Sequence, residues 1–371
     1  MKKITNILLL VFLSVVMISG TAYAISGQCS NCHTMHASQN GTLWGDGPHD
    51  YLLLYSCLGC HSANNNESVR SDTNAPRVLS TNAAPGGQGN GNTLAGGDFY
   101  WVANGSDALG HNVDLVAGQD AAIGANIGNQ PPGWDDTLTD GAGNSIADAT
   151  WTVQLTCAGT YGCHGDHSNS GNDAGIQGAH HSNPGTDSLI TAPTAVGNSY
   201  RFCDRIEGKE DATWNWGETT ALHNEYFGST YNDGSALDKG TISFFCAECH
   251  GDYHTTADVG GTSSPWLRHP TDIVLGRGAG TEYSDYNNGG TTYNLEAPVA
   301  RPVVDGSSPT ATVDPNDNST SDGAIVMCLS CHRAHGSPQP DILRWDYTTI
   351  IAGGGSLNSG CFVCHTTKDT P

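Results

Sequence analysis

Over most of this chain, hydrophobic and polar positions follow neither of the two periods that mark regular secondary structure. Long stretches, such as residues 82–112 and 302–323, mix glycine, asparagine and aspartate with isolated apolar residues. They show no helical repeat of about 3.6 residues and no strand alternation of about 2. The pattern predicts a mostly irregular, loop-rich fold with short helices and little sheet.

The longest apolar run lies at the N-terminus, from Ile7 to Ile18. It follows Lys2 and Lys3 and precedes Ala22-Tyr23-Ala24. This order is typical of a secretory signal, so we expect residues 1–24 to be cleaved and residues 25–371 to form a single domain. An uncleaved anchor is the alternative, but the run is shorter than the roughly 20 residues that span a bilayer. No later segment is apolar enough to cross a membrane.

Composition raises a problem for an ordinary globular core. Of 371 residues 48 are glycine, and only 37% are hydrophobic. Such a chain is either disordered, or something other than its side chains fills the interior. The formal charge of −23, which becomes more negative once the two signal lysines are removed, excludes a nucleic-acid binder and disfavours docking on anionic lipid.

Cysteine spacing suggests what fills the interior. The pattern Cys-x-x-Cys-His occurs five times, and on one helical turn it places two thiols and an imidazole on the same face. This predicts c-type haem attachment; structural zinc or disulfides are the alternatives. Stacked haems would then form the core. The predicted attachment cysteines are Cys29 and Cys32, Cys57 and Cys60, Cys246 and Cys249, Cys328 and Cys331, and Cys361 and Cys364.

A sixth attachment site is expected in the segment "CAGTYGCHGDH". Five residues separate Cys157 from Cys163, and His164 follows directly. The two intervening glycines permit the positive φ values that a bulged loop requires. The alternative is a disulfide between Cys157 and Cys203, which would leave Cys163 with one thioether or no haem.

Histidines are numerous enough for two axial ligands on every haem. The predicted proximal ligands directly follow the motif cysteines: His33, His61, His164, His250, His332 and His365. Four more histidines come three or four residues later, namely His36, His167, His254 and His335. Such a residue stays on the proximal side of its own porphyrin, so we expect it to ligate a neighbouring haem. The alternative is a hydrogen bond to a haem propionate.

The chain resembles the OmcS-type family of hexahaem, filament-forming outer-surface c-type cytochromes. The shared segments are "CHTMH", "GGDFYWV", "GHNV", "LRHP", "CLSCHRAH" and "DYTTI", in the same order. The resemblance implies six stacked bis-histidine haems, with His111 and His269 completing a distal set that also contains His36, His167, His254 and His335. It further implies that His36 ligates the Cys328/Cys331 haem of the adjacent identical subunit. The third motif departs from the family, which has two residues between these cysteines.

We therefore predict a non-enzymatic electron conduit in an extracellular or cell-surface filament, with other outer-surface or periplasmic cytochromes and external electron acceptors as partners. A monomeric periplasmic shuttle is the first alternative. A multihaem oxidoreductase with one open haem is the second, although the surplus of histidines argues against it. His49, His180, His181 and His223 have no motif support, but His180 and His181 could replace His167.

Overall fold

The computed structural model describes about two thirds of the chain. The described residues are 27–39, 42–43, 47, 49–64, 67–70, 72–73, 75–81, 84–85, 93–120, 130–135, 137–144, 153–184, 188–211, 218–229, 238–254, 271–276, 286–287, 289–305, 311–351 and 359–365. The predicted signal segment and His269 lie outside these ranges. The division at residue 24 therefore stays a prediction.

Helices in the described ranges are short. The α-helices are α2 (Cys57–His61), α3 (Tyr100–Asn104), α5 (Asn172–Gly175), α6 (Ala179–Ser182) and α7 (Ile242–His250). Single 3-10 turns join them, and three of these turns, η1 (Cys29–Asn31), η8 (Cys328–Ser330) and η11 (Gly360–Val363), carry cysteine motifs. None of these helices has the length and apolarity needed to span a bilayer.

Strands are two or three residues long and pair in small, separate sheets. The pairs are antiparallel β1 (Ser38–Gln39) with β2 (Thr42–Leu43) and β10 (Ile273–Val274) with β11 (Ile325–Val326), and parallel β3 (Ser62–Ala63) with β4 (Leu79–Ser80) and β5 (Thr156–Ala158) with β6 (Gly162–His164). One antiparallel three-stranded sheet contains β7 (Leu189–Ile190), β8 (Gly208–Lys209) and β9 (Glu225–Tyr226). The predicted loop-rich fold with short helices and little sheet is confirmed.

Buried apolar side chains form three clusters rather than one core. One surrounds Tyr286 and Val299, a second surrounds Ile206 and Ile325, and the smallest centres on Phe99. Motif cysteines such as Cys331, Cys364 and Cys157 lie at the edges of these clusters. The thiols are therefore placed where an apolar group bound to them would extend the clusters.

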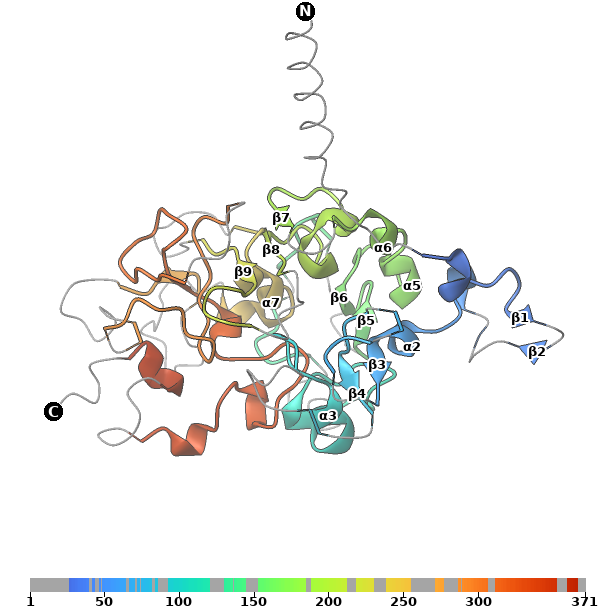
Figure 1. Cartoon of the computed structure of the whole chain (residues 1–371), viewed down its shortest axis with the longest axis horizontal. Coiled ribbons are helices and arrows are strands. Elements are labelled where there is room, and N and C mark those ends of the chain that lie inside the picture. The colour runs from blue at the N-terminus through green and yellow to red at the C-terminus, as the bar shows by residue number, and fades with distance from the viewer. Residues whose placement is uncertain are drawn as a thin grey trace, which may run out of the picture.

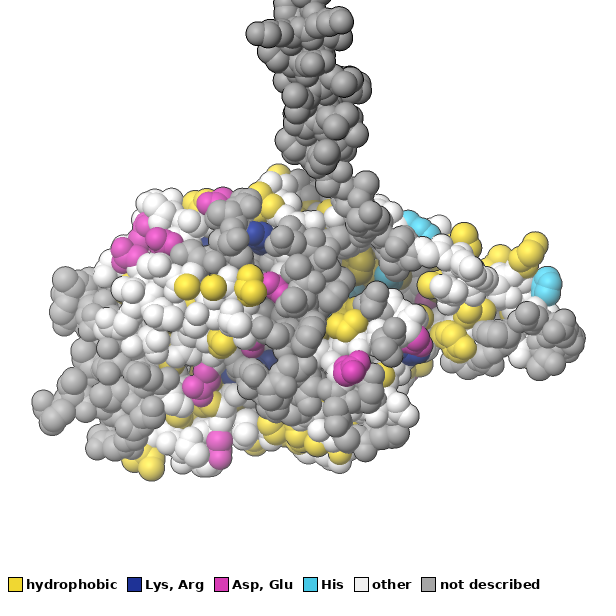
Figure 2. Space-filling model, in the orientation of Figure 1, with side chains coloured by type: hydrophobic (Ala, Val, Ile, Leu, Met, Phe, Trp, Pro, Cys, Tyr) yellow, Lys and Arg dark blue, Asp and Glu magenta, His cyan; other side chains and the backbone are white. Residues whose placement is uncertain are grey.

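The described residues between Gly27 and Leu52, which we call the arm and which end in η2 (Asp50–Leu52), project from one end of the molecule. Figure 1 shows β1 and β2 of the arm at the right, while the C-terminal segments, orange to red, lie in the opposite half. The arm exposes large apolar side chains, including Met35 at 86% and Leu43 at 70%. Figure 2 shows apolar and histidine side chains gathered there. An apolar surface of this kind favours contact with another protein.

Candidate haem-binding sites

The five Cys-x-x-Cys-His motifs all form helical turns. In the 3-10 turns, the histidine amide donates to the carbonyl of the first cysteine, with distances of 2.8 Å for His33, 3.1 Å for His332 and 3.0 Å for His365. The other two motifs are the whole of α2 and the last turn of α7. Each turn therefore presents two thiols and an imidazole within one compact stretch of backbone, as predicted from their spacing.

The longer third motif brings its two cysteines and its histidine together on strands instead of a helical turn. Parallel strands β5 and β6 pair Thr156 with Gly162 and Ala158 with His164, so Cys157 lies opposite Cys163. Paired positions on neighbouring strands are about 4.8 Å apart and direct their side chains to the same face. We call this pair of strands the cysteine ladder. It supports the two thiols side by side despite the five intervening residues.

The alternatives of disulfides and zinc find no support at these motifs. All thirteen cysteines are free thiols. Cys157 hydrogen-bonds the thiol of Cys57, whereas Cys203 is buried with its Sγ 3.8 Å from Nδ1 of His164. Within the described ranges, no three cysteine, histidine or acidic side chains gather as a metal ion would require.

Each of five motif histidines contacts a backbone carbonyl through Nδ1. A carbonyl only accepts hydrogen bonds, so Nδ1 carries the proton and the lone pair of Nε2 is available for a metal. This is the usual tautomer of a haem ligand, and it fits the group that the cysteines predict. The contacts are His33 to Tyr51 O (3.1 Å), His61 to Pro76 O (2.9 Å), His164 to Arg201 O (2.9 Å), His250 to Pro132 O (2.7 Å) and His332 to Asp341 O (2.8 Å).

Three of these carbonyls belong to the same structural device, which we call the strap turn. This turn occurs three times, at residues 50–53, 200–203 and 340–343. Its carbonyls accept hydrogen bonds from the histidines of the first, third and fifth motifs, respectively. In each strap turn the second residue accepts from the histidine, and the third accepts from the amide after that histidine at 2.7–2.9 Å. The two central residues are left-handed, with φ from 48° to 62°: Tyr51 and Leu52, Arg201 and Phe202, and Asp341 and Ile342.

Left-handed backbone costs a non-glycine residue about 1–2 kcal/mol. Of the twelve non-glycine residues with a positive φ in the described ranges, six are these central residues. Their repeated occurrence beside motif histidines indicates that the surrounding contacts hold each carbonyl toward the imidazole. The second and fourth motifs use the carbonyls of Pro76 and Pro132 instead. Nothing in the sequence marks the strap turns, because five of their six central residues are types that rarely adopt this conformation.

Four motif histidines face a second histidine at nearly the same separation. A metal–imidazole bond is about 2 Å long and the ring centroid lies roughly 1.2 Å behind the nitrogen, so two ligands across one metal have centroids about 6.4 Å apart. The observed centroid separations are 6.1 Å for His33 and His181, 6.2 Å for His61 and His180, 6.2 Å for His250 and His111, and 6.4 Å for His164 and His335.

In three of the four pairs, those of His61, His164 and His250, burial lowers the pKa of both imidazoles and so favours their neutral form. It lowers the pKa of His250 to about 4, with His111 adding to the effect, and the pKa of His335 to about 3, with His164 adding to it. A neutral imidazole is the form that binds a metal. The histidines of these three pairs therefore favour the protonation state that axial ligation of a haem requires.

The structure places the other predicted distal ligands differently. His36 is exposed on the arm, where Nδ1 lies 2.9 Å from Ser38 Oγ. His167 is buried 3.3 Å from a carboxylate oxygen of Asp140, and Nε2 of His254 is 2.8 Å from Asp272. The described contacts bring neither His167 nor His254 opposite a motif histidine, so their ligand roles stay predictions.

Interactions between thiols link the six attachment sites in chain order. The thiols of Cys57 and Cys157 hydrogen-bond each other, which joins the second and third motifs, and Cys246 does the same with Cys328 of the fifth. Burial raises the pKa of Cys60, Cys249 and Cys331, and a cysteine of the preceding or following motif adds to each rise: Cys32 for Cys60, Cys163 for Cys249, and Cys364 for Cys331.

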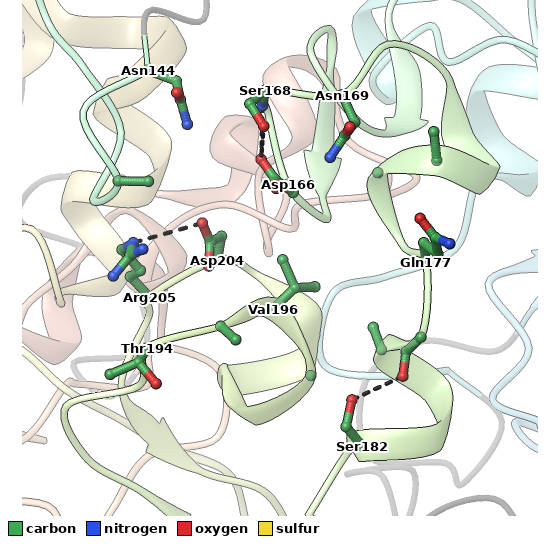
Figure 3. Close-up of a pocket in the computed structure, with 17 residues that line it drawn as sticks. Asn144, Asp166, Ser168, Asn169, Gln177, Ser182, Thr194, Val196, Asp204 and Arg205 are labelled. Atoms are coloured by element: carbon green, nitrogen blue, oxygen red, sulfur yellow. Dashed lines mark hydrogen bonds and ion pairs between the residues drawn. The ribbon is translucent and has the colours of Figure 1, made fainter.

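A polar cavity of about 490 Å³ lies beside α6. Asp166, Asp204, Arg205 and Asn144 line it, and the lining contains neither cysteine nor histidine. Figure 3 shows Ser182 of α6 at its rim, where the hydroxyl donates to the carbonyl of Gly178 at 2.8 Å. The cavity is not a haem site by its chemistry.

Cysteine turns, facing histidine pairs and a loop-rich fold are together typical of multihaem c-type cytochromes. Residues 322–370 match the family described as a doubled CXXCH motif. The chain is 25% identical over 382 residues to the C-type cytochrome OmcS of Geobacter sulfurreducens, covering 89% of this chain and 82% of OmcS. The similarity to OmcS-type cytochromes inferred from the motifs is confirmed.

Two solved structures of OmcS are also similar to this chain. One is described as an outer membrane cytochrome S filament from Geobacter sulfurreducens, with 19% identity, a TM-score of 0.39, and coverage of 93% of this chain and 92% of the other. The second is described as OmcS nanowires from the same organism, with 20% identity, a TM-score of 0.44, and coverage of 93% and 94%.

Proposed function

We propose that this protein is an electron conduit that carries six covalently attached haems and polymerises into an extracellular filament. The observation that carries the proposal is the run of six cysteine sites, each next to the following one in chain order. When bound, each haem supplies one-electron redox chemistry. The chain supplies the spacing, the axial ligands and an interior from which water is excluded.

Attachment of the haems uses the thiols that the motifs predict, with Cys157 and Cys163 of the cysteine ladder holding the third. The proximal ligands are the six motif histidines. His335 and His111 act as distal ligands for the haems of His164 and His250, respectively, because their rings lie at the separation expected across an iron. His335 follows the fifth motif and reaches the third, which is the cross-ligation expected from its place in the sequence.

Polymerisation is supported by the position of the arm and by the exposure of its side chains. The arm, with His36 exposed, lies at one end of the molecule, and the C-terminal segments lie in the opposite half. A contact between different surfaces of identical subunits produces an open chain when it does not close into a ring. We propose that His36 ligates the haem held by Cys328, Cys331 and His332 of the next subunit, as the resemblance to OmcS implies.

Export, the filament and the partners belong to the same proposal. The filament lies at the cell surface, receives electrons from other outer-surface or periplasmic cytochromes, and passes them to extracellular acceptors. No step of this transfer needs an open coordination position, so we assign no enzymatic activity. His269 remains a predicted axial ligand.

Mass spectrometry of the purified mature protein tests the haem count, and electron microscopy tests assembly. We expect a mass increase of six haems and filaments in surface preparations. His36→Ala is expected to abolish filaments while the haem count stays unchanged, and His49→Ala is the matched control. Filaments that persist in His36→Ala would exclude the ligand from the neighbouring subunit, and a mass of fewer than five haems would exclude the conduit.

A further inference from the structure

The tandem histidines of α6, His180 and His181, are not among the distal ligands that the motifs predict. They nevertheless form two of the four histidine pairs described above. His181 faces His33 at 6.1 Å with ring planes inclined by 21°. His180 faces His61 at 6.2 Å with an inclination of 37°. In both pairs the motif histidine donates Nδ1–H to a carbonyl, so its Nε2 is available for a metal.

The backbone around α6 holds the two rings in these positions. The helix begins after Gly178, whose φ of 73° is left-handed and therefore favours glycine. Ala179 is buried, and Gly197 of η4 (Val196–Asn198) approaches it so closely that an added Cβ would lie 3.4 Å from the Ala179 Cα. The inner side of α6 is thus fixed against η4, and the histidines that follow Ala179 face the motifs.

Two further contacts tie α6 to the sites it serves. The hydroxyl of Tyr51, in the first strap turn, donates to Gln177 Oε1 at 3.3 Å, two residues before α6. The ring of Phe202, in the second strap turn, lies 4.9 Å from the ring of His180. Both contacts are independent of the histidine pairs. They place α6 between the first motif and the backbone that supports the third.

We infer that His181 and His180 are the second axial ligands of the haems held by His33 and His61, so that consecutive residues of one helix bind two different irons. The inference rests on the proposed attachment of haem at Cys29/Cys32 and Cys57/Cys60. It leaves His167 and His254, which contact carboxylates, outside the coordination of these two haems.

The test uses the full-length mature holoprotein with single substitutions His180→Ala and His181→Ala. Wild-type haem is expected to be low-spin. In each variant about one haem in six becomes high-spin, as measured by EPR and magnetic circular dichroism, and about two in six do so in the double variant. Added imidazole restores the low-spin signal. His49→Ala, which removes a half-buried histidine outside the motifs and outside the proposed ligand set, is the control and stays low-spin.

A second experiment assigns each ligand to its haem. In a Cys29→Ser/Cys32→Ser background, His181→Ala should add no high-spin iron, whereas His180→Ala should still add it. Single variants that stay fully low-spin with the wild-type mass would overturn the inference. If the alanine variants lose haem, His180→Met and His181→Met are measured instead; a raised potential at one haem supports the ligand role, and unchanged potentials overturn it. A wild-type protein without haem at these motifs would instead reject the proposed function.

Discussion

The attachment site on α7 and the cysteine ladder both place two thiols side by side, the first on a helix and the second on a pair of strands. On α7, Cys246 and Cys249 lie one helical turn apart, and Thr241 caps the helix by accepting from the amide of Phe244 at 3.0 Å. In the ladder, Cys157 and Cys163 lie on paired strands. The helix is held by its own hydrogen bonds, whereas the ladder depends on contacts from outside.

Those contacts come from α5 and from close backbone approaches. The amide of Ala158 donates to Asn172 Oδ1 at 2.8 Å, and Gly159 has a left-handed φ of 84°. A Cβ on Gly162 would lie 2.5 Å from the backbone of Ala158. The comparison teaches that attachment needs two thiols side by side followed by an imidazole, and that a particular secondary structure is not required.

Removing both cysteines of either site is expected to have the largest effect. Cys157→Ser/Cys163→Ser and Cys246→Ser/Cys249→Ser should each lower the mass of the mature protein by one haem, because both sites are proposed to bind covalently. Cys157→Ser alone should keep the haem through Cys163, with a pyridine haemochrome spectrum that shows one remaining vinyl group. A wild-type mass for Cys157→Ser/Cys163→Ser would show that the ladder is not an attachment site.

The dependence of the ladder on close backbone contact predicts an intermediate effect. Gly162→Ala should force β5 and β6 apart, which costs about 1–3 kcal/mol and lowers occupancy of the third site alone. Denaturant unfolding and peptide-resolved mass spectrometry measure the two effects. Gly118→Ala is the matched control, because its added Cβ would meet nothing within 4 Å. Equal behaviour of the two variants would contradict the described packing of the ladder.

The smallest predicted effect concerns the strap turns, which serve the ladder but not α7. Leu52 has a φ of 56° and is 47% exposed, so its left-handed backbone can be tested with little loss of packing. Leu52→Gly should raise the free energy of unfolding by about 1 kcal/mol, whereas Leu53→Gly, in extended backbone, should lower it by a similar amount. Thermal unfolding of both variants checks the difference. Destabilisation by Leu52→Gly would mean that the strap turn carries no backbone strain.

The parts of this structure that depend on adjacent residues could be predicted from the sequence, and the parts that depend on distant ones could not. The five helical motifs and the loop-rich fold follow from local spacing and composition. The pairing of His181 with His33 joins residues far apart in the chain, so only the tandem histidines hinted at it. The ladder had a partial signal in Gly159 and Gly162, but its parallel pairing did not follow from them.

The acceptors beside the motif histidines have one more consequence. All five described acceptors are backbone carbonyls, and a carbonyl neither gains nor loses a proton across the physiological range. A carboxylate in that place would link each oxidation of the iron to proton uptake or release. With a carbonyl as the acceptor, no proton is taken up or released at the ligand when the iron gains or loses an electron. We therefore expect these five ligands to contribute little to any change of haem potential with pH.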